Sequence, residues 1–196
     1  MAAGFVQSLE GVMPERQLAQ PWESLFEHFY LEHYRRVVSV LFRLTGSRSE
    51  AEDLANEVFV RLYRRRLLPQ PDGNVPGWLY RTATNVGIDG LRKNARRRQH
   101  ELEAAQAAAQ SRENAGPLDE ILRDERRRQV RQVLARLKPV HAQALILRSS
   151  GFSYHEVAEA LGMKRVSVGT LLLRAEQAFR KHYRAVAGMA GEEEEI

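Results

Sequence analysis

The chain of 196 residues contains no cysteine and carries a formal net charge of +5, with 30 lysine and arginine residues against 25 aspartate and glutamate residues. The absence of thiols excludes a disulfide framework, a thiolate metal site and a cysteine nucleophile, and the basic balance suits a polyanionic partner. No apolar run approaches the length of a membrane span, and the N-terminal residues lack the basic start and apolar run of a signal peptide. We therefore expect a soluble cytoplasmic protein.

The first half of the chain predicts two helices after a loose leader over residues 1–20. Apolar residues at helical spacing predict the first helix from Trp22 to Leu44, and Gly46 should end it. Ser47, with Glu50 three residues later, predicts a capping box at the start of the second helix, "SRSEAEDLANEVFVRLYRRR". Off its apolar stripe lie Asp53, Asn56, Glu57 and Arg61.

A Pro/Gly-rich loop, "LLPQPDGNVPG", precedes a third predicted helix, "WLYRTATNVGIDGLRKNARRRQ". Trp78 and Leu79 begin its apolar face, and we expect Trp78 in the core. The helix ends in a run of basic residues, which is either a solvated face or a phosphate-binding surface. The run comprises Arg92, Lys93, Arg96, Arg97 and Arg98.

The second half follows a flexible linker predicted over residues 101–117, a polar stretch rich in Ala and Gln. Helices are predicted in "LDEILRDERRRQVRQVLARL" and in "PVHAQALILRSSG". The sequence shows no strand pattern, so the expected fold class is all-α. We expect two small helical domains, over residues 21–100 and 118–187, and an acidic disordered tail over residues 188–196.

The stretch "SYHEVAEALGMKRVSVGTLLLRAEQ" predicts a helix-turn-helix, with a plain helical hairpin as the alternative. Ser153 and Glu156 predict a second capping box, and Gly162 supplies the tight turn. The next helix restarts near Lys164. Its spacing predicts buried positions at Val168, Leu172, Ala175 and Phe179.

Two further leucines, Leu171 and Leu173, lie about 100° to either side of Leu172 on this helix. One interpretation is that both widen the packed face. The other is that Leu173 contacts a thymine methyl group or that both leucines bind a partner protein. Gly169 would let the backbone approach a phosphate closely.

Taken together, the two halves resemble an extracytoplasmic-function (ECF) sigma factor of bacterial RNA polymerase, over about Trp22 to Ala187. In the first half the matching motifs are "AEDLANEVFVRLY" and "WLYRTATNVGIDGLRK". In the second half they are "LKPVHAQALILRSSGFSYHEVAEALG" and Arg174-Ala175. The resemblance implies a sigma factor that binds core RNA polymerase and directs promoter-specific transcription initiation.

Two other classes of function fit the sequence less well. A stand-alone helix-turn-helix regulator gives no reason for the two motifs of the first half. The six histidines are scattered without metal-ligand spacing, and the sequence has no phosphate-binding Gly loop or nucleophile elbow. We therefore expect no enzyme, with no catalytic residue, metal or cofactor.

The resemblance implies that the first domain docks on the β′ coiled coil of polymerase and that the second contacts the β flap. The docking positions would be Asp53, Asn56, Glu57 and Arg61. The family usually has glutamine at the place of Asn56. The alternative is that acidic residues here only stabilise the positive N-terminus of their helix.

The resemblance also implies that the third helix reads and melts the downstream promoter element and holds one strand. Asn85 matches the asparagine of "WLYR-x-A-x-N", and its amide can read a base edge. The loop over residues 68–77 occupies the base-capturing position but has three prolines and no aromatic residue. The remaining DNA contacts implied in this domain are Asp89, Arg92, Lys93, Arg96 and Arg97.

The second domain would read the upstream promoter element in duplex form. The family often has basic residues at the places of Gly169 and Leu171, so we expect a non-standard upstream preference. Members are often held by an anti-sigma factor, and the acidic run Glu192–Glu195 either aids solubility or folds back on the basic helices. The DNA contacts implied here are Lys164, Arg165, Ser167, Gly169, Thr170, Leu173 and Arg174.

Overall fold

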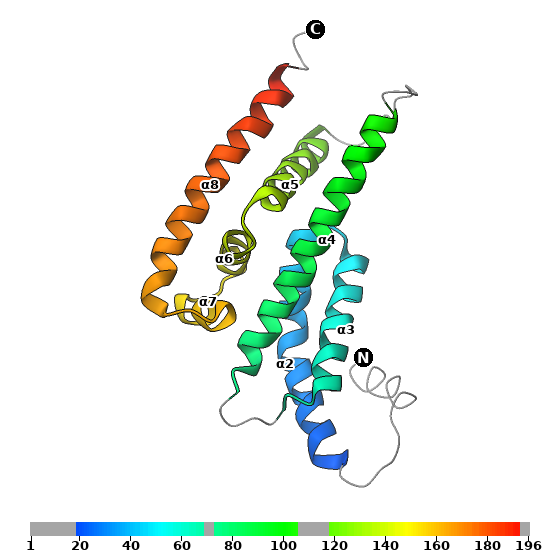
Figure 1. The fold of residues 1–196 in the computed structure, drawn as a ribbon. Coiled ribbons are helices and arrows are strands. Elements are labelled where there is room, and N and C mark those ends of the chain that lie inside the picture. The colour runs from blue at the N-terminus through cyan, green and yellow to red at the C-terminus, as the bar shows by residue number, and fades with distance from the viewer. Residues whose placement is uncertain (1–18, 69–72, 106–117, 193–196) are drawn as a thin grey trace.

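In the computed structural model of the protein, the described residues are 19–68, 73–105 and 118–192. These ranges contain seven helices and no strand, so the all-α prediction is confirmed for them (Figure 1). The helices are α2 (Ala19–Thr45), α3 (Arg48–Arg65), α4 (Val75–Ala105), α5 (Leu118–Arg136), α6 (Pro139–Ser149), α7 (Tyr154–Leu161) and α8 (Arg165–Glu192).

Helices α2, α3 and α4 enclose an aromatic and aliphatic core. Phe26 of α2 meets Phe59 of α3 edge to face, with 6.4 Å between the ring centroids, and both side chains are fully buried. Gly87 lets α4 approach α2 closely, because a Cβ atom at this position would lie 2.5 Å from Leu44 Cδ1. The close approach offsets the roughly 1 kcal/mol that a glycine costs in a helix interior.

The two predicted capping boxes differ in outcome. Ser153 and Glu156 form the complete reciprocal box at the start of α7. Ser47 also accepts a hydrogen bond from the backbone N–H of Glu50, but its own N–H donates to Thr45 Oγ1 at 3.3 Å. The second half of that box is therefore wrong, because a nearer hydroxyl at the end of α2 takes the place of the Glu50 carboxylate.

The helix-turn-helix consists of α7, a turn at Gly162 and the first part of α8. Gly162 has φ of 64°, in the left-handed region that a tight turn requires. Of the positions predicted to face the core, Val168, Leu172 and Ala175 are buried, whereas Phe179 is only half-buried. The four-three-four spacing therefore identified the packed face of α8.

Two helices continue into the segments predicted as linker and tail. Residues 101–105 continue α4, because "ELEA" consists of good helix formers and contains no breaker. Residues 188–192 continue α8, since no proline interrupts its backbone hydrogen bonds. The rest of the linker (106–117), the last four residues and most of the leader lie outside the described residues.

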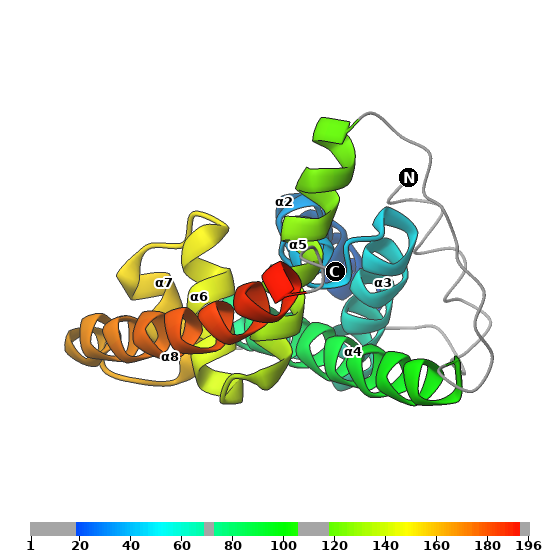
Figure 2. The same ribbon diagram turned by 90° about the horizontal axis from the view of Figure 1, so that it is seen from above.

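Helix α4 makes most of the contacts between the two halves of the molecule. It packs against α2 and α3 of its own half and against α5, α6 and α7 of the second half, and Figure 1 shows α8 outermost, with the same helices seen from above in Figure 2. Buried residues of both halves form one continuous cluster. In the described ranges, none of the helices combines the length and the apolar character needed to cross a membrane.

The close packing at Gly87 predicts opposite effects for two substitutions in one helix. Gly87→Ala should lower the free energy of unfolding by roughly 1 kcal/mol, because Leu41 and Leu44 are buried and cannot move away freely. Gly90→Ala is the matched control and should raise it by about 0.5–1 kcal/mol, since nothing beyond the adjoining backbone of α4 lies within 4 Å of the added methyl group. Urea unfolding measures both, and a shift in the same direction would contradict the packing argument.

Candidate nucleic-acid interface

The predicted docking residues gather on the outer face of α3. Asp53 and Glu57 are exposed and Asn56 is half-buried, whereas the opposite side of the helix packs into the core. Arg61 Nη2 donates to Glu57 Oε1 one turn earlier on this face. The structure therefore brings the four side chains together on one polar surface that is open to a partner.

One side of α4 faces the second half of the chain, and three of its side chains form hydrogen bonds with that half. Arg81 Nε donates to the carbonyl oxygen of Ala160 at 2.6 Å. Asn85 Oδ1 accepts a hydrogen bond from Gln143 Nε2 at 2.6 Å. Arg92 Nη2 donates to a carbonyl oxygen at the end of α5, at 2.7 Å. Two of the residues implied in DNA binding, Asn85 and Arg92, thus contact the second domain.

Two arginines of α4 bind helix ends. The last carbonyl groups of a helix have no partner within it, and a cation there also complements the helix dipole. Arg81 meets this need at the end of α7, where Asn74 Nδ2 also donates to the carbonyl oxygen of Glu159 at 3.1 Å. Arg92 does the same at the end of α5 through the carbonyl groups of Ala135 and Leu137.

A second contact between the halves centres on Arg36 of α2. Its Nη1 atom lies 2.6 Å from Glu156 Oε1, and its guanidinium lies 3.7 Å from the ring centroid of Phe152. Phe152 is fully buried and meets Tyr80 of α4 edge to face at 4.5 Å between centroids. Glu156 thus both caps α7 and pairs with the first domain.

The environment of Glu156 lowers the pKa of its carboxyl group. Partial burial alone would raise this pKa, but hydrogen bonds from Arg36 and from Ser153 outweigh it. The result is a pKa of about 2 in place of 4.5, so the group is ionised at neutral pH.

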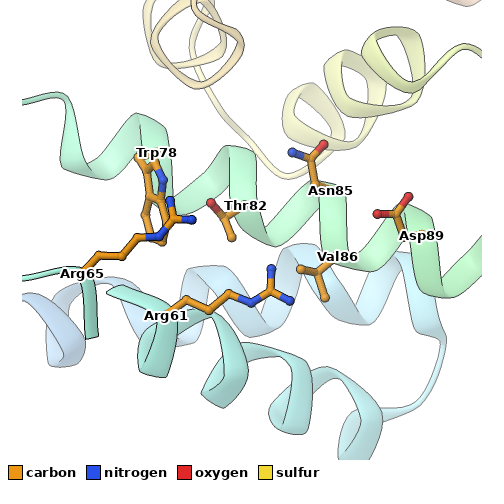
Figure 3. Close-up of a pocket in the computed structure, with 7 residues that line it drawn as sticks. All are labelled: Arg61, Arg65, Trp78, Thr82, Asn85, Val86 and Asp89. Carbon is orange, nitrogen blue, oxygen red and sulfur yellow. The ribbon is translucent and has the colours of Figure 1, made fainter. Parts of the chain in front are cut away.

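A pocket of about 320 Å³ lies between α3 and α4, beside the engaged face (Figure 3). Trp78 forms one wall, with the Arg65 guanidinium 5.6 Å from its ring centroid. Trp78 packs against the core as predicted, yet it is only half-buried and also borders this pocket. The lining residues are Arg61, Arg65, Trp78, Thr82, Asn85, Val86 and Asp89.

The other predicted DNA contacts are open to solvent. On α4 these are Asp89, Lys93, Arg96 and Arg97. Lys164 just before α8 is also exposed, and so are Arg165, Ser167, Thr170, Leu173 and Arg174 on α8, with Gly169 half-buried. Leu171 is half-buried against the core, as the packing interpretation predicts for it. Leu173 remains 56% exposed, so packing does not account for it.

Sequence reasoning missed the residues that join the halves. Arg81 and Tyr80 stand inside the "WLYR" motif, but nothing local shows that they reach α7 or Phe152. Gln143 is buried in α6, where a polar residue in an apolar segment was the available signal. Among the described residues, no cluster of histidine and acidic side chains could hold a metal ion.

Comparison with known families accounts for both halves in order. The model of sigma-70 region 2 matches residues 29–97, and the model of sigma-70 region 4 matches residues 127–179. The chain belongs to the ECF sigma factors of the sigma-70 family. We call its two domains region 2 and region 4 from here on.

Several relatives share this arrangement. The ECF RNA polymerase sigma factor SigE of Mycolicibacterium smegmatis is 32% identical over 169 residues, which are 85% of this chain, although the match spans only 63% of the length of SigE. The RNA polymerase sigma factor YlaC of Bacillus subtilis is 29% identical over 157 residues, covering 80% of this chain and 90% of YlaC. The structure of CnrH in complex with the cytosolic domain of CnrY has the same fold, with a TM-score of 0.53, 16% identity and coverage of 94% and 95% of the two chains.

The ion pair of Glu156 predicts a pH-dependent effect of Glu156→Gln. Because the pKa of Glu156 falls from 4.5 to about 2 on folding, its stabilisation is present above pH 4.5 and is lost as the pH falls toward 2. Urea unfolding should find the variant less stable above about pH 5, with a difference that shrinks as the carboxylate of the wild type is protonated. Glu159→Gln is the control, since that carboxylate faces His155 instead. A difference that stays constant down to low pH would contradict the pairing.

Proposed function

We propose that the protein is the promoter-specificity subunit of an RNA polymerase holoenzyme and carries out no chemistry itself. The observation that carries this proposal is the match to region 2 and region 4 in sequence order, over residues 29–97 and 127–179. Region 2 would dock on the polymerase and hold the melted downstream element. Region 4 would contact the β flap and read the upstream element as duplex.

The outer face of α3 suits the docking role. Its exposed carboxylates and one amide can pair with cationic and polar side chains on a coiled coil. Arg61 links this face to the pocket that Asn85 and Asp89 also line, so the polymerase contact and the DNA contact would be adjacent.

The side of α4 that contains Asn85 suits a melted strand. An amide oxygen and nitrogen can pair with a base edge, and the exposed Lys93 and Arg96 can meet phosphates further along the helix. The pocket beside Trp78 has the size and the partly aromatic wall that an unstacked base would need.

We propose further that the arrangement described here is a closed form of the free protein. DNA on this side of α4 would have to occupy the space where α5, α6 and α7 now pack. Asn85 would also have to exchange Gln143 for a base, and Arg92 would have to exchange carbonyl groups for a phosphate. Binding to polymerase would therefore separate region 4 from region 2, and a partner that clamps the two together would keep the protein inactive.

The docking proposal predicts that Asp53→Ala weakens the complex with core polymerase. The expected loss is about tenfold in affinity, as for one charged contact at an interface, measured by fluorescence anisotropy with labelled protein and core enzyme that lacks any sigma factor. Glu52→Ala is the matched control. It removes the neighbouring carboxylate of the same helix, so it changes the interaction with the helix dipole as Asp53→Ala does and should leave polymerase affinity unchanged. Duplex binding without any polymerase complex would instead favour a stand-alone regulator.

The closed form predicts that a double variant, Arg36→Ala with Gln143→Ala, opens the protein. Both substitutions remove contacts between the regions and leave the core of region 2 intact, so the radius of gyration in solution scattering should rise. Affinity for a single-stranded oligonucleotide of the downstream element should rise about five- to tenfold, since two partly buried polar contacts no longer compete. Arg35→Ala, at the exposed neighbouring position, should change neither quantity. An unchanged radius and affinity in the double variant would contradict closure.

A further inference from the structure

An apolar stripe runs along the open side of α8. Val166 is 85% exposed and Leu173 is 56% exposed, the first and third highest values among the large hydrophobic residues with a described exposure. Seven residues make two helical turns with an offset of only about 20°, so the two side chains share one side of the helix. Thr170 lies between them and is also exposed. We call Val166, Thr170 and Leu173 the apolar stripe.

The packing of the domain does not explain this stripe. The buried positions of α8 are Val168, Leu172 and Ala175, on a different side of the helix. The stripe also takes no part in closure, because the hydrogen bonds and the ion pair between the regions come from α5, α6 and α7. It is therefore available to a partner in the closed and in the opened protein.

The surroundings of the stripe are cationic. Lys164 and Arg165 stand at the start of α8 and Arg174 stands just beyond Leu173, all exposed, and the first turn has no acidic residue. Tyr154 borders the stripe, since a Cβ atom on Gly169 would lie 3.8 Å from its ring, and Arg148 lies 5.1 Å from the centroid of that ring. An apolar strip with a cationic rim fits a polyanion that presents apolar groups between its charges.

Duplex DNA meets this description in its major groove. An α-helix fits that groove, and the thymine methyl is the apolar group that a base pair presents there. Valine and leucine side chains cannot donate or accept hydrogen bonds, so they can read thymine but not the polar edges of the other bases. The rise over seven helical residues is about 10.5 Å, which corresponds to about three base-pair steps of 3.4 Å.

We propose that Val166 and Leu173 are specificity-determining residues that read the methyl groups of two thymines about three base pairs apart in the upstream promoter element. Lys164, Arg165 and Arg174 hold the flanking phosphates and set the register. This inference rests on the proposed function, because it assumes that α8 enters the upstream element.

The test replaces thymine with deoxyuridine, which removes only the methyl group. The holoenzyme assembled from the full chain and core polymerase first selects its upstream sequence from random duplexes. Each thymine of the selected duplex is then exchanged singly. We expect two positions, about three base pairs apart, at which the exchange weakens binding about fourfold, the ratio that burial of one methyl group gives.

Variants assign each methyl group to a side chain. Leu173→Ala should abolish the difference between thymine and deoxyuridine at one position, and Val166→Ala at the other. Both residues are exposed, so neither change should affect folding. Arg174→Ala is the control: it should weaken all duplexes alike and reduce the salt dependence of binding, while the sensitivity to deoxyuridine stays.

Failure of this inference can be told apart from failure of the proposed function. If the chain forms no holoenzyme, or the holoenzyme selects no upstream sequence, the proposed function fails and the stripe proposal fails with it. If selection succeeds but both variants keep the full response to deoxyuridine, only the stripe proposal is overturned. If Leu173→Ala lowers transcription without changing duplex binding, the stripe serves a protein partner and the thymine proposal is overturned.

Discussion

The structure depends on a helix that is packed on two sides. One side of α4 inserts Leu79, Ala83 and Gly87 into the region 2 core, where the missing side chain of Gly87 allows close approach to Leu44. The other side presents polar groups to region 4. Helix α4 packs against α2 and α3 in region 2 and against α5, α6 and α7 in region 4. Its position therefore fixes both domains at once. A shift of α4 would loosen a hydrophobic core and a polar interface together.

Under the proposed function, the polar side of α4 would serve two exclusive partners. The end of a helix offers an array of carbonyl oxygens with partial negative charge, and a nucleic-acid strand offers phosphates and base acceptors. Guanidinium and amide groups bind both kinds of oxygen. Arg92 now binds the end of α5 and Asn85 binds Gln143, so region 4 occupies the same donors and acceptors that a promoter strand would need. Under the proposed function, region 4 and the promoter strand would therefore compete for these groups.

Local features of the fold could be predicted from the sequence, and distant contacts could not. The complete cap of Ser153 and Glu156 and the buried positions Val168 and Leu172 depend on residues a few places apart, so their spacing identifies them. The cap at Ser47 was half wrong because the Thr45 hydroxyl competes locally.

Contacts between the regions have no such local pattern. Arg36 and Glu156 stand 120 residues apart, and Asn85 and Gln143 stand 58 apart, so only the packing of the whole chain brings them together. The candidate surfaces on α3 and α8 could be predicted as surfaces, because they are the positions that remain once the buried face of each helix has been assigned.

Within region 4, the interface with region 2 and the exposed surface of α8 are formed by different helices, and this separation has a consequence for sequence variation. Arg81 and Arg92 bind main-chain carbonyl groups, which every residue type possesses, so substitutions on α5 and α7 leave these acceptors in place. The apolar stripe of α8 lies outside this interface. Under the two proposals, substitutions confined to α8 would therefore change the upstream sequence preference and leave the closed form intact.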